Sequence, residues 1–325
     1  MKAIVQREYG GADVLEFAEV DKPGIRDKEV LLRVRAASVH VGDVLAMQGT
    51  PYVMRAAFGL TRPRNPTPGF DVAGTVEAVG SKVSRFKPGD EVFGNGTGTL
   101  AEYAAAKESQ LVAKPPGLTF EQAAVLTVSG LTALKAVRDV ANVQPGQTVL
   151  INGAAGGIGV YAVQIAKAMG AEVTAVCSAG KADLVRSLGA DHVIDYAEED
   201  FTLGERRYDF ILDNVGNRSL SECRRVLSPN GTLSPNSGTA GGKWIGPLVS
   251  MGQAWVTSPF VSQNIRTFLS TPNEEDLNTL VELVESGKVV PVIGGTYQLS
   301  EGAEALRVVA SGHAQGKVVI TVAED

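Results

Sequence analysis

The sequence predicts an α/β protein with two domains, one β-rich and one a doubly wound parallel sheet with helices on both faces. Residues 1 to about 120 hold short apolar runs separated by glycine and proline turns, which predict a barrel-like or folded β domain. After Thr119, apolar strands alternate with helical patterns, as in the repeated βα units of a parallel sheet. The length of 325 residues, 44% of them apolar, is enough for two domains with cores.

Charge and composition exclude several kinds of partner. A net charge of -6 and a pI near 5.3 argue against nucleic acid or an anionic membrane surface. No apolar run reaches the length of a membrane span, and the N-terminus is typical of a strand rather than a signal peptide. Cys177 and Cys223 lie in predicted regular elements, where buried free thiols in a reducing compartment are expected. We therefore expect a soluble cytoplasmic protein.

The strands of the β-rich domain are predicted from alternation and turn signals. In residues 28–39 the apolar side chains fall on one face and the arginines on the other. Further strands are expected at residues 70–79, 91–93, 100–105 and 110–113. After an amphipathic helix at 274–286, strand-like alternation returns from Val289, and a helix at 301–310 precedes a strand at 316–322. This tail is expected to rejoin the β-rich domain and make it discontinuous.

The parallel-sheet domain is introduced by a capping box, Thr119-Phe-Glu-Gln122, before an apolar helix. Helices are then expected at residues 131–140, 158–169, 181–188 and 218–227. Strands are expected at residues 147–152, 171–177, 192–196, 208–213, 231–237 and 265–269. Residues 238–247 are expected to form a loop after a strand, where ligands gather at the carboxyl edge. The expected domains are 1–122 and 272–325 for the two parts of the β-rich domain and 123–271 for the parallel-sheet domain.

The stretch from Gln147 to Tyr196 carries the strongest functional signal. A buried strand leads directly into a glycine-rich turn and a helix that is closed by Gly170. Glycines permit a tight turn, let a pyrophosphate approach the backbone and let the helix pack close to the strand. The free N–H groups at the helix start then bind phosphates. A dinucleotide is therefore expected on Gly153, Ala154, Ala155, Gly156, Gly157, Ile158 and Gly159.

The end of the second strand indicates which dinucleotide is preferred. Enzymes selective for NAD usually place an Asp or Glu there, about 20 residues past the glycines. Here Cys177 is followed by Ser178 and then, within the next turn, by Lys181. A hydroxyl and a cation suit the 2′-phosphate of NADPH. A helix-capping serine and a solvated lysine are the structural alternative.

Several segments, spread over nearly the whole chain, carry a resemblance to a known enzyme family: Pro68-Gly-Phe-Asp-Val-Ala-Gly-Thr-Val76, Phe86-Lys-Pro-Gly-Asp-Glu-Val-Phe93, Asn152-Gly-Ala-Ala-Gly-Gly-Ile-Gly159, Leu188-Gly-Ala-Asp191 with Ile194-Asp-Tyr196, and Gly316-Lys317-Val318. Through these segments, which stand in the family's order, the chain resembles the zinc-independent quinone oxidoreductase branch of the medium-chain dehydrogenase/reductase superfamily. The resemblance implies a GroES-like catalytic domain with a discontinuous C-terminal part, a Rossmann domain, a nicotinamide cofactor in the cleft and usually a homodimer.

The resemblance also implies roles for single residues. Tyr52 resembles a family tyrosine near the nicotinamide that orients the substrate or relays a proton; plain pocket wall is the alternative. Thr127 matches a family threonine near the nicotinamide ribose; a hydroxyl that bonds its own helix backbone is the alternative. His40 and Asp43 join Tyr52 in the expected catalytic set. Further cofactor contacts are expected at Tyr196, Asn214, Val215, Ser237 and Lys317.

The chain departs from the zinc members of the superfamily at their ligands. The zinc members have a sequence that resembles Gly-His-Glu at the position of Gly69-Phe70-Asp71. The phenyl ring of Phe70 therefore stands where those members have one metal ligand. His40 stands at the position of a ligand cysteine, and the four-cysteine structural lobe is absent. His40, Asp43 and Asp71 form a nitrogen–oxygen set, but catalytic zinc needs three protein ligands in fixed geometry. No metal is therefore expected, and His40 is expected to line the cleft. His192 and His313 are expected to be structural or surface residues.

Three function classes fit these observations. The first is an NADPH-dependent reductase of quinones, and the second is a reductase of α,β-unsaturated carbonyls. The third is a non-enzymatic NADPH-binding protein, such as a redox-responsive scaffold. Reducing a simple ketone builds an alkoxide, which needs a Lewis acid or a well-placed proton donor. A conjugated acceptor spreads the charge that the hydride delivers, so the protein has to supply only orientation and a dry, aromatic pocket.

The strand end at Ser178 generates a first prediction. NADPH should bind at least about tenfold more tightly than NADH, because two charge-assisted contacts contribute about 1.5–3 kcal/mol each. Lys181→Ala should reduce this preference in a fluorescence titration with both cofactors. Equal affinity of the unmodified protein for NADPH and NADH would contradict the assignment.

Overall fold

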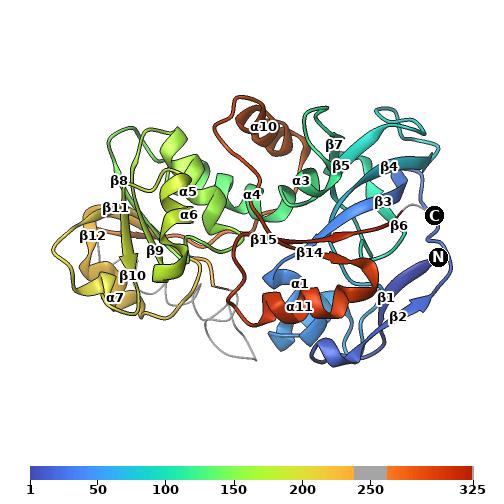
Figure 1. Ribbon diagram of the computed structural model, residues 1–325, viewed down its shortest axis with the longest axis horizontal. Coiled ribbons are helices and arrows are strands. Elements are labelled where there is room, and N and C mark those ends of the chain that lie inside the picture. Colours follow the sequence, from blue (N-terminus) through green and yellow to red (C-terminus); the bar gives the residue numbers. More distant parts are fainter. Residues whose placement is uncertain (238–261, 324–325) are drawn as a thin grey trace. The chain divides into compact units, whose positions relative to one another are not determined.

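The computed structural model describes residues 1–237 and 262–323, which belong to two compact units (Figure 1). Unit 1 comprises Met1–Leu131, Thr271–Gly287 and Pro291–Asp325, and unit 2 comprises Thr132–Ser270 and Lys288–Val290. The loop expected at residues 238–247 lies outside the described residues. No helix in the described part of the chain combines the length and the apolar character needed to cross a membrane.

Unit 2 is built on a six-stranded sheet whose strands all run parallel, in the order β10-β9-β8-β11-β12-β13. The strands are β8 (Thr148–Asn152), β9 (Glu172–Cys177), β10 (His192–Asp195), β11 (Tyr208–Asp213), β12 (Leu227–Pro235) and β13 (Asn264–Ile265). The chain order reverses between β8 and β11, so the carboxyl ends of these strands form the switch point where ligands bind. The predicted doubly wound, Rossmann-type sheet is confirmed.

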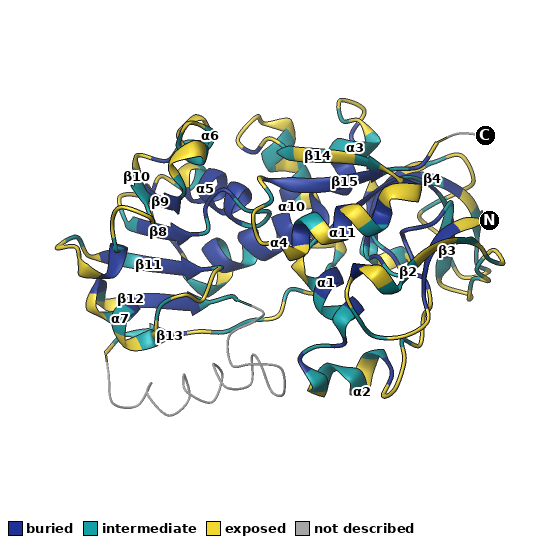
Figure 2. Ribbon diagram, turned by 60° about the horizontal axis from the view of Figure 1, so that its bottom comes forward, coloured by how far each residue is buried: buried dark blue, intermediate teal, exposed yellow. Residues whose placement is uncertain are grey.

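The helices of unit 2 surround this sheet. They are the π-helix η4 (Lys135–Val140), α5 (Gly159–Ala168), η5 (Ala179–Lys181), α6 (Ala182–Ser187), η6 (Phe201–Leu203) and α7 (Leu220–Arg225). Helix α5 is buried from Gly159 to Ala166, because β8, β9 and η4 all pack against it (Figure 2). The sequence predicted one apolar face on this helix, whereas the structure buries every residue from Gly159 to Ala166. The expected glycine stop is confirmed, since the amides of Gly170 and Ala171 donate to Lys167 and Ala166 in a Schellman motif.

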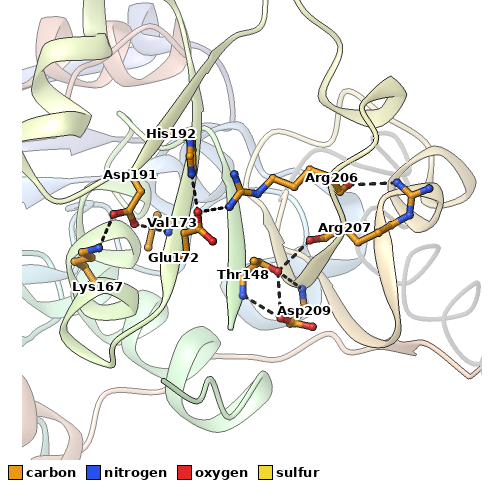
Figure 3. Close-up of polar contacts among 9 residues, drawn as sticks. All are labelled: Thr148, Lys167, Glu172, Val173, Asp191, His192, Arg206, Arg207 and Asp209. Carbon is orange, nitrogen blue, oxygen red and sulfur yellow. Dashed lines mark hydrogen bonds and ion pairs between the residues drawn. The ribbon is translucent and has the colours of Figure 1, made fainter. Parts of the chain in front are cut away.

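Surface polar contacts join the amino ends of the unit 2 strands, at the edge away from the switch point (Figure 3). The Thr148 amide donates to Oδ2 of Asp209 at 2.9 Å, which connects β8 to β11. Nε2 of His192 lies 2.7 Å from Oε1 of Glu172, which connects β10 to β9. His192 and His313 are exposed, so the expectation that they are surface residues is confirmed. Cys177 and Cys223 are buried free thiols, as expected.

Unit 1 contains a two-stranded sheet, β1-β2, and a seven-stranded sheet in the order β14-β15-β3-β4-β5-β7, with β6 paired to β3. The strands are β1 (Lys2–Gln6), β2 (Leu15–Glu19), β3 (Glu29–Val39), β4 (Asp71–Val79), β5 (Glu91–Asn95), β6 (Tyr103–Lys107), β7 (Leu111–Ala113), β14 (Ile293–Gln298) and β15 (Lys317–Thr321). Strand β15 runs antiparallel to β3, with Val318 opposite Val39, so the tail of the chain lies beside the N-terminal strands. This β-rich, GroES-like unit confirms the predicted fold class.

Short helices complete unit 1. They are η1 (Ala12–Val14), α1 (Val41–Gln48), η2 (Tyr52–Met54), α2 (Arg55–Phe58), η3 (Glu108–Gln110), α3 (Phe120–Ala124), α4 (Thr127–Leu134, which continues into unit 2), α10 (Glu274–Glu285), η8 (Leu299–Glu301) and α11 (Gly302–Ala310). The predicted capping box of α3 is confirmed, because the Gln122 amide donates to Thr119 Oγ1 and the Thr119 amide donates to Gln122 Oε1.

Several expected elements differ from the structure in where they begin or end. The strand expected at 231–237 starts at Leu227, where β12 first pairs with β11. The strand expected at 100–105 starts at Tyr103, because Leu100 and Ala101 pair instead with the loop at Pro68 and with β1. The strand expected at 265–269 ends at Ile265, where its pairing with β12 stops. The helix expected at 131–140 starts four residues earlier, at Thr127, and becomes a π-helix from Lys135.

Candidate functional site

A buried ion pair lies at the start of β4 in unit 1. Nζ of Lys317 lies 3.5 Å from Oδ2 of Asp71, and neither side chain is more than 1% exposed. The Ser38 hydroxyl donates to the same oxygen at 2.8 Å, and the Val128 amide donates to Oδ1 at 3.1 Å. The first residues of β4 and β15, the end of β3 and the first turn of α4 therefore meet at one carboxylate.

His40 and Asp43 lie at the start of α1. The His40 amide donates to Oδ2 of Asp43 at 2.8 Å, and the imidazole Nε2 lies 3.4 Å from the same oxygen without hydrogen-bond geometry. Nε2 of His40 and Oδ1 of Asp43 are buried and have no hydrogen-bond partner among the described residues. Phe70 stacks on the imidazole with 6.0 Å between ring centroids, and Phe58 meets Phe70 edge-on at 6.2 Å. The predicted residues His40 and Asp43 thus lie together, next to the rings of Phe70 and Phe58, which we call the aromatic wall.

Burial sets the ionisation of these groups. Burial and the Asp71 carboxylate raise the pKa of Asp43 to about 8. Burial and the Lys317 cation hold the pKa of His40 well below its ordinary value. Burial also raises the pKa of Asp71, against the opposing effect of Lys317. Near neutral pH the site therefore holds a neutral imidazole and a largely protonated Asp43, and a carboxylic acid in that state can donate a proton.

Thr127 opens α4, one residue before the amide that Asp71 binds. Its side chain is fully buried, and its hydroxyl has no hydrogen-bond partner in the described part of the chain. The alternative in which this hydroxyl bonds its own helix backbone is therefore wrong. A buried hydroxyl without a partner is unfavourable, so this oxygen is available to a ligand. Its contact with a ribose stays a prediction.

The other unit 1 predictions are placed as follows. Tyr52 is partly buried at the start of η2, and its ring lies 4.6 Å below the guanidinium carbon of Arg55. Lys317, predicted to contact the cofactor, is only 1% exposed, and its Nζ also donates to the Val39 carbonyl at 3.4 Å. The roles of Tyr52 and Lys317 both stay predictions.

The glycine-rich turn follows β8 at the switch point of unit 2. Gly159 has no room for a side chain, because a Cβ there would lie 2.2 Å from the Gly153 carbonyl oxygen. Gly153 has a φ of 76°, and a Cβ on it would lie 2.9 Å from Val215. Outside helix α5 itself, the amides of Gly157 and Ile158 make no hydrogen bond to any described residue. Unpaired amides at the start of a helix are the groups that bind phosphate.

A polar network supports this turn from the neighbouring strand ends. Oδ1 of Asp213, at the end of β11, accepts from Asn152 Nδ2 at 2.8 Å and from the amide of Val215 at 3.1 Å. Nδ2 of Asn214 donates to the Asn152 carbonyl at 3.2 Å, and Nδ2 of Asn236 donates to Oδ1 of Asn214 at 2.8 Å. The predicted residues Asn214 and Val215 therefore lie beside the glycine turn. Sequence reasoning missed Asn152, Asp213 and Asn236, although each is a polar residue at the end of an apolar strand.

The end of β9 offers a hydroxyl and cations. The Ser178 hydroxyl makes no capping bond to η5 and no other hydrogen bond within the described residues, so the capping alternative is wrong. Burial and Asp195 raise the pKa of the Cys177 thiol, while nearby Lys181 and Arg186 act against that rise. Sequence reasoning missed Arg186, a second cation, which lies in the last turn of α6 and pairs with Asp183 at 3.1 Å.

Two more predicted cofactor residues follow neighbouring strands. Tyr196 is 51% exposed and donates its amide to the Cys177 carbonyl at 3.2 Å, which places it beside the end of β9. Ser237 follows β12 at the same edge of the sheet and is partly buried. Their contacts with a cofactor stay predictions.

A Rossmann sheet with a phosphate-binding turn and a GroES-like unit with a buried ionisable site define a dinucleotide-dependent dehydrogenase or reductase. Family models describe residues 26–116 as an alcohol dehydrogenase GroES-like domain and residues 188–320 as a zinc-binding dehydrogenase. A spinach (Spinacia oleracea) protein named quinone-oxidoreductase homolog, chloroplastic, is 36% identical over 98% of both chains. The chain belongs to the quinone oxidoreductase branch of the medium-chain dehydrogenase/reductase superfamily.

Two further comparisons agree with this family. An Arabidopsis thaliana protein named NADPH-dependent alkenal/one oxidoreductase, chloroplastic, is 34% identical over 98% of this chain and 79% of its own length. The solved structure of the quinone oxidoreductase from Coxiella burnetii superposes with a TM-score of 0.88 at 30% identity, over 99% of each chain.

The raised pKa of Asp43 predicts a pH-dependent stability. An acid whose pKa is raised by folding stabilises the protein below its ordinary pKa, and this contribution is lost as the pH rises to about 8. The depressed pKa of His40 has the opposite effect, but only below its ordinary value of 6.5. Between pH 6.5 and 8 the free energy of unfolding should therefore fall by up to about 1.4 kcal/mol per pH unit. Asp43→Asn should flatten this slope.

Urea titrations at several pH values in this window measure the slope. Asp27→Asn is the matched control, because the Lys82 and Ser81 hydrogen bonds lower the pKa of Asp27, which is ionised throughout the window in both states. The control should keep the slope of the unmodified protein. An unchanged slope in Asp43→Asn would contradict a protonated Asp43.

Proposed function

We propose that the protein is an NADPH-dependent oxidoreductase that transfers a hydride to a quinone without zinc. The observation that carries the proposal is the pairing of Phe70 with His40, which puts an aromatic ring on the imidazole where the zinc members of the family have a metal ligand. Among the described residues no three His, Cys, Asp or Glu side chains gather as metal ligands. This supports a reduction that relies on orientation and hydrogen bonds.

The residues at the sheet edge fit NADPH. The close approach at Gly159, the unpaired amides of Gly157 and Ile158, and the hydroxyl and cations after β9 suit a pyrophosphate and a 2′-phosphate. When bound, the nicotinamide supplies the hydride. We propose that the cofactor is held by Thr127, Gly153, Ala154, Ala155, Gly156, Gly157, Ile158, Gly159, Ser178, Lys181, Tyr196, Asn214, Val215, Ser237 and Lys317.

The residues of unit 1 then orient the acceptor and provide the proton. His40 and Tyr52 would hydrogen-bond the acceptor oxygen, and Asp43 keeps a proton next to His40 near neutral pH. Phe70 and Phe58 would keep water from the planar acceptor. The buried pair of Asp71 and Lys317 fixes the strand ends on which these side chains are mounted.

Reduction of α,β-unsaturated carbonyls is the second candidate, since the same aromatic wall suits an enone and a related protein is named for alkenals and alkenones. A non-enzymatic NADPH-binding role is the third.

We further propose a homodimer located in the cytoplasm, with domains at 1–122, 123–271 and 272–325. The names of two relatives place those proteins in the chloroplast.

The proposed chemistry predicts a preference for conjugated acceptors. Without a Lewis acid, an alkoxide formed from a saturated ketone is poorly stabilised, whereas the charge on a quinone or an enone is delocalised. With NADPH, kcat/KM for benzoquinone or methyl vinyl ketone should exceed that for butanone by at least about a hundredfold, or about 2.7 kcal/mol of transition-state free energy.

Steady-state assays compare methyl vinyl ketone with butanone, which differ only in conjugation. A higher kcat/KM for benzoquinone than for methyl vinyl ketone favours the quinone reductase, and the reverse order favours the enone reductase. Comparable rates on the pair would show that an unrecognised acid or metal acts in the site. NADPH binding without turnover of any acceptor would favour the non-enzymatic role.

A further inference from the structure

Arg55, the first residue of α2, makes cation–π contacts with two tyrosine rings. Its guanidinium carbon lies 4.5 Å from the centre of the Tyr9 ring and 4.6 Å from that of the Tyr52 ring. Its Nε donates to the Gly49 carbonyl at 2.9 Å, and the Tyr9 hydroxyl donates to the Gly59 carbonyl at 2.6 Å. The cation is therefore fixed in position by two stacking contacts and a hydrogen bond.

The backbone makes room for this arrangement at Gly49. Its φ is 62°, and a Cβ there would lie 2.6 Å from the Tyr9 ring and 2.8 Å from Nε of Arg55. A side chain at this position would push the ring and the guanidinium apart. The contact between Arg55 and Tyr9 therefore depends on a glycine in the left-handed region.

The guanidinium still has donors to offer. Arg55 makes no ion pair in the described part of the chain, and its two terminal nitrogens donate to no described residue. The side chain is only partly buried. A pre-positioned arginine with both terminal nitrogens available matches the geometry of a carboxylate or a phosphate.

The surrounding sequence is cationic. Residues 44–70 contain Arg55, Arg62 and Arg64 but no aspartate or glutamate, although the whole chain has a net charge of -6. This local excess of positive charge attracts anions to one segment of an otherwise acidic protein.

The cation adjoins the aromatic wall of the candidate site. Arg55 stacks on Tyr52, which is part of the predicted catalytic set. One turn further along α2, Phe58 meets Phe70, and Phe70 stacks on His40. An acceptor that lies along this wall can therefore extend a substituent toward Arg55.

From this placement we infer that Arg55 is a specificity-determining residue that binds an anionic oxygen group of the acceptor. The preferred acceptors are then conjugated carbonyl compounds that carry a carboxylate or a phosphate. This inference rests on the proposed reductase function and specifies its substrate class.

The test uses the carboxylate of β-acetylacrylic acid and its methyl ester, two enones that differ in one negative charge. Arg55→Gln should lower the ratio of kcat/KM for the acid to that for the ester by at least about tenfold, mainly through KM for the acid. Arg62→Gln is the matched control, because it removes an equal charge from an exposed position of the same segment and should leave the ratio unchanged. Arg55→Lys keeps the charge and should retain part of the preference.

Two outcomes would overturn the inference. An equal loss of kcat/KM for the acid and the ester in Arg55→Gln would mean that Arg55 only positions Tyr52. An equal drop of the acid-to-ester ratio in Arg62→Gln would mean that the positive charge of the whole segment, rather than Arg55, attracts the acid. If the unmodified protein reduces neither enone but turns over benzoquinone, only the enone candidate fails; if it does not turn over benzoquinone either, the proposed function fails. In both cases calorimetric titration with the same two compounds tests the inference. Tighter binding of the acid that disappears in Arg55→Gln supports the inference, and equal binding of acid and ester contradicts it.

Discussion

The buried ion pair between Asp71 and Lys317 is the contact on which the candidate site of unit 1 depends. A charge pair removed from water costs several kcal/mol per ion unless further hydrogen bonds complete it. Here Ser38 and the Val128 amide complete the carboxylate, and the Val39 carbonyl helps to complete the ammonium group. Removing one partner would leave an uncompensated buried charge, which is strongly unfavourable. The pair therefore holds the end of β3, the first residues of β4 and β15 and the start of α4 together.

The same pair also affects the ionisation of His40 and Asp43. Burial is the main reason why a charged His40 and a charged Asp43 are disfavoured; the Lys317 cation adds to this effect at His40, and the Asp71 carboxylate adds to it at Asp43. Asp43, which ordinarily carries charge near neutral pH, is thereby kept largely neutral, and His40 stays neutral beside the rings of Phe70 and Phe58. A neutral, water-poor surface with one held proton suits an acceptor whose charge is delocalised.

The sequence predicted best what depends on neighbouring residues. The strand, glycine turn and helix around Gly153 follow from local periodicity and from conformations that glycine adopts readily, and the capping box at Thr119 is likewise local. The contacts of Asp71 with Lys317 and of Arg55 with Tyr9 join residues that are distant in the chain, and Tyr52 and Arg55 lie in two very short helices that have no readable periodicity. Hydrophobic patterns carry no information on such pairs. The length of β13 was missed for a similar reason, since its end is set by pairing with β12 rather than by its own composition.

The central claim of this account is that unit 1 supports hydride transfer through buried charges and aromatic packing, without a metal. The most direct test measures zinc by plasma mass spectrometry in the purified protein and compares NADPH-dependent quinone turnover before and after treatment with EDTA. The account predicts well under one zinc per chain and unchanged turnover. A stoichiometric zinc whose removal abolishes turnover would contradict it and would make His40 a metal ligand.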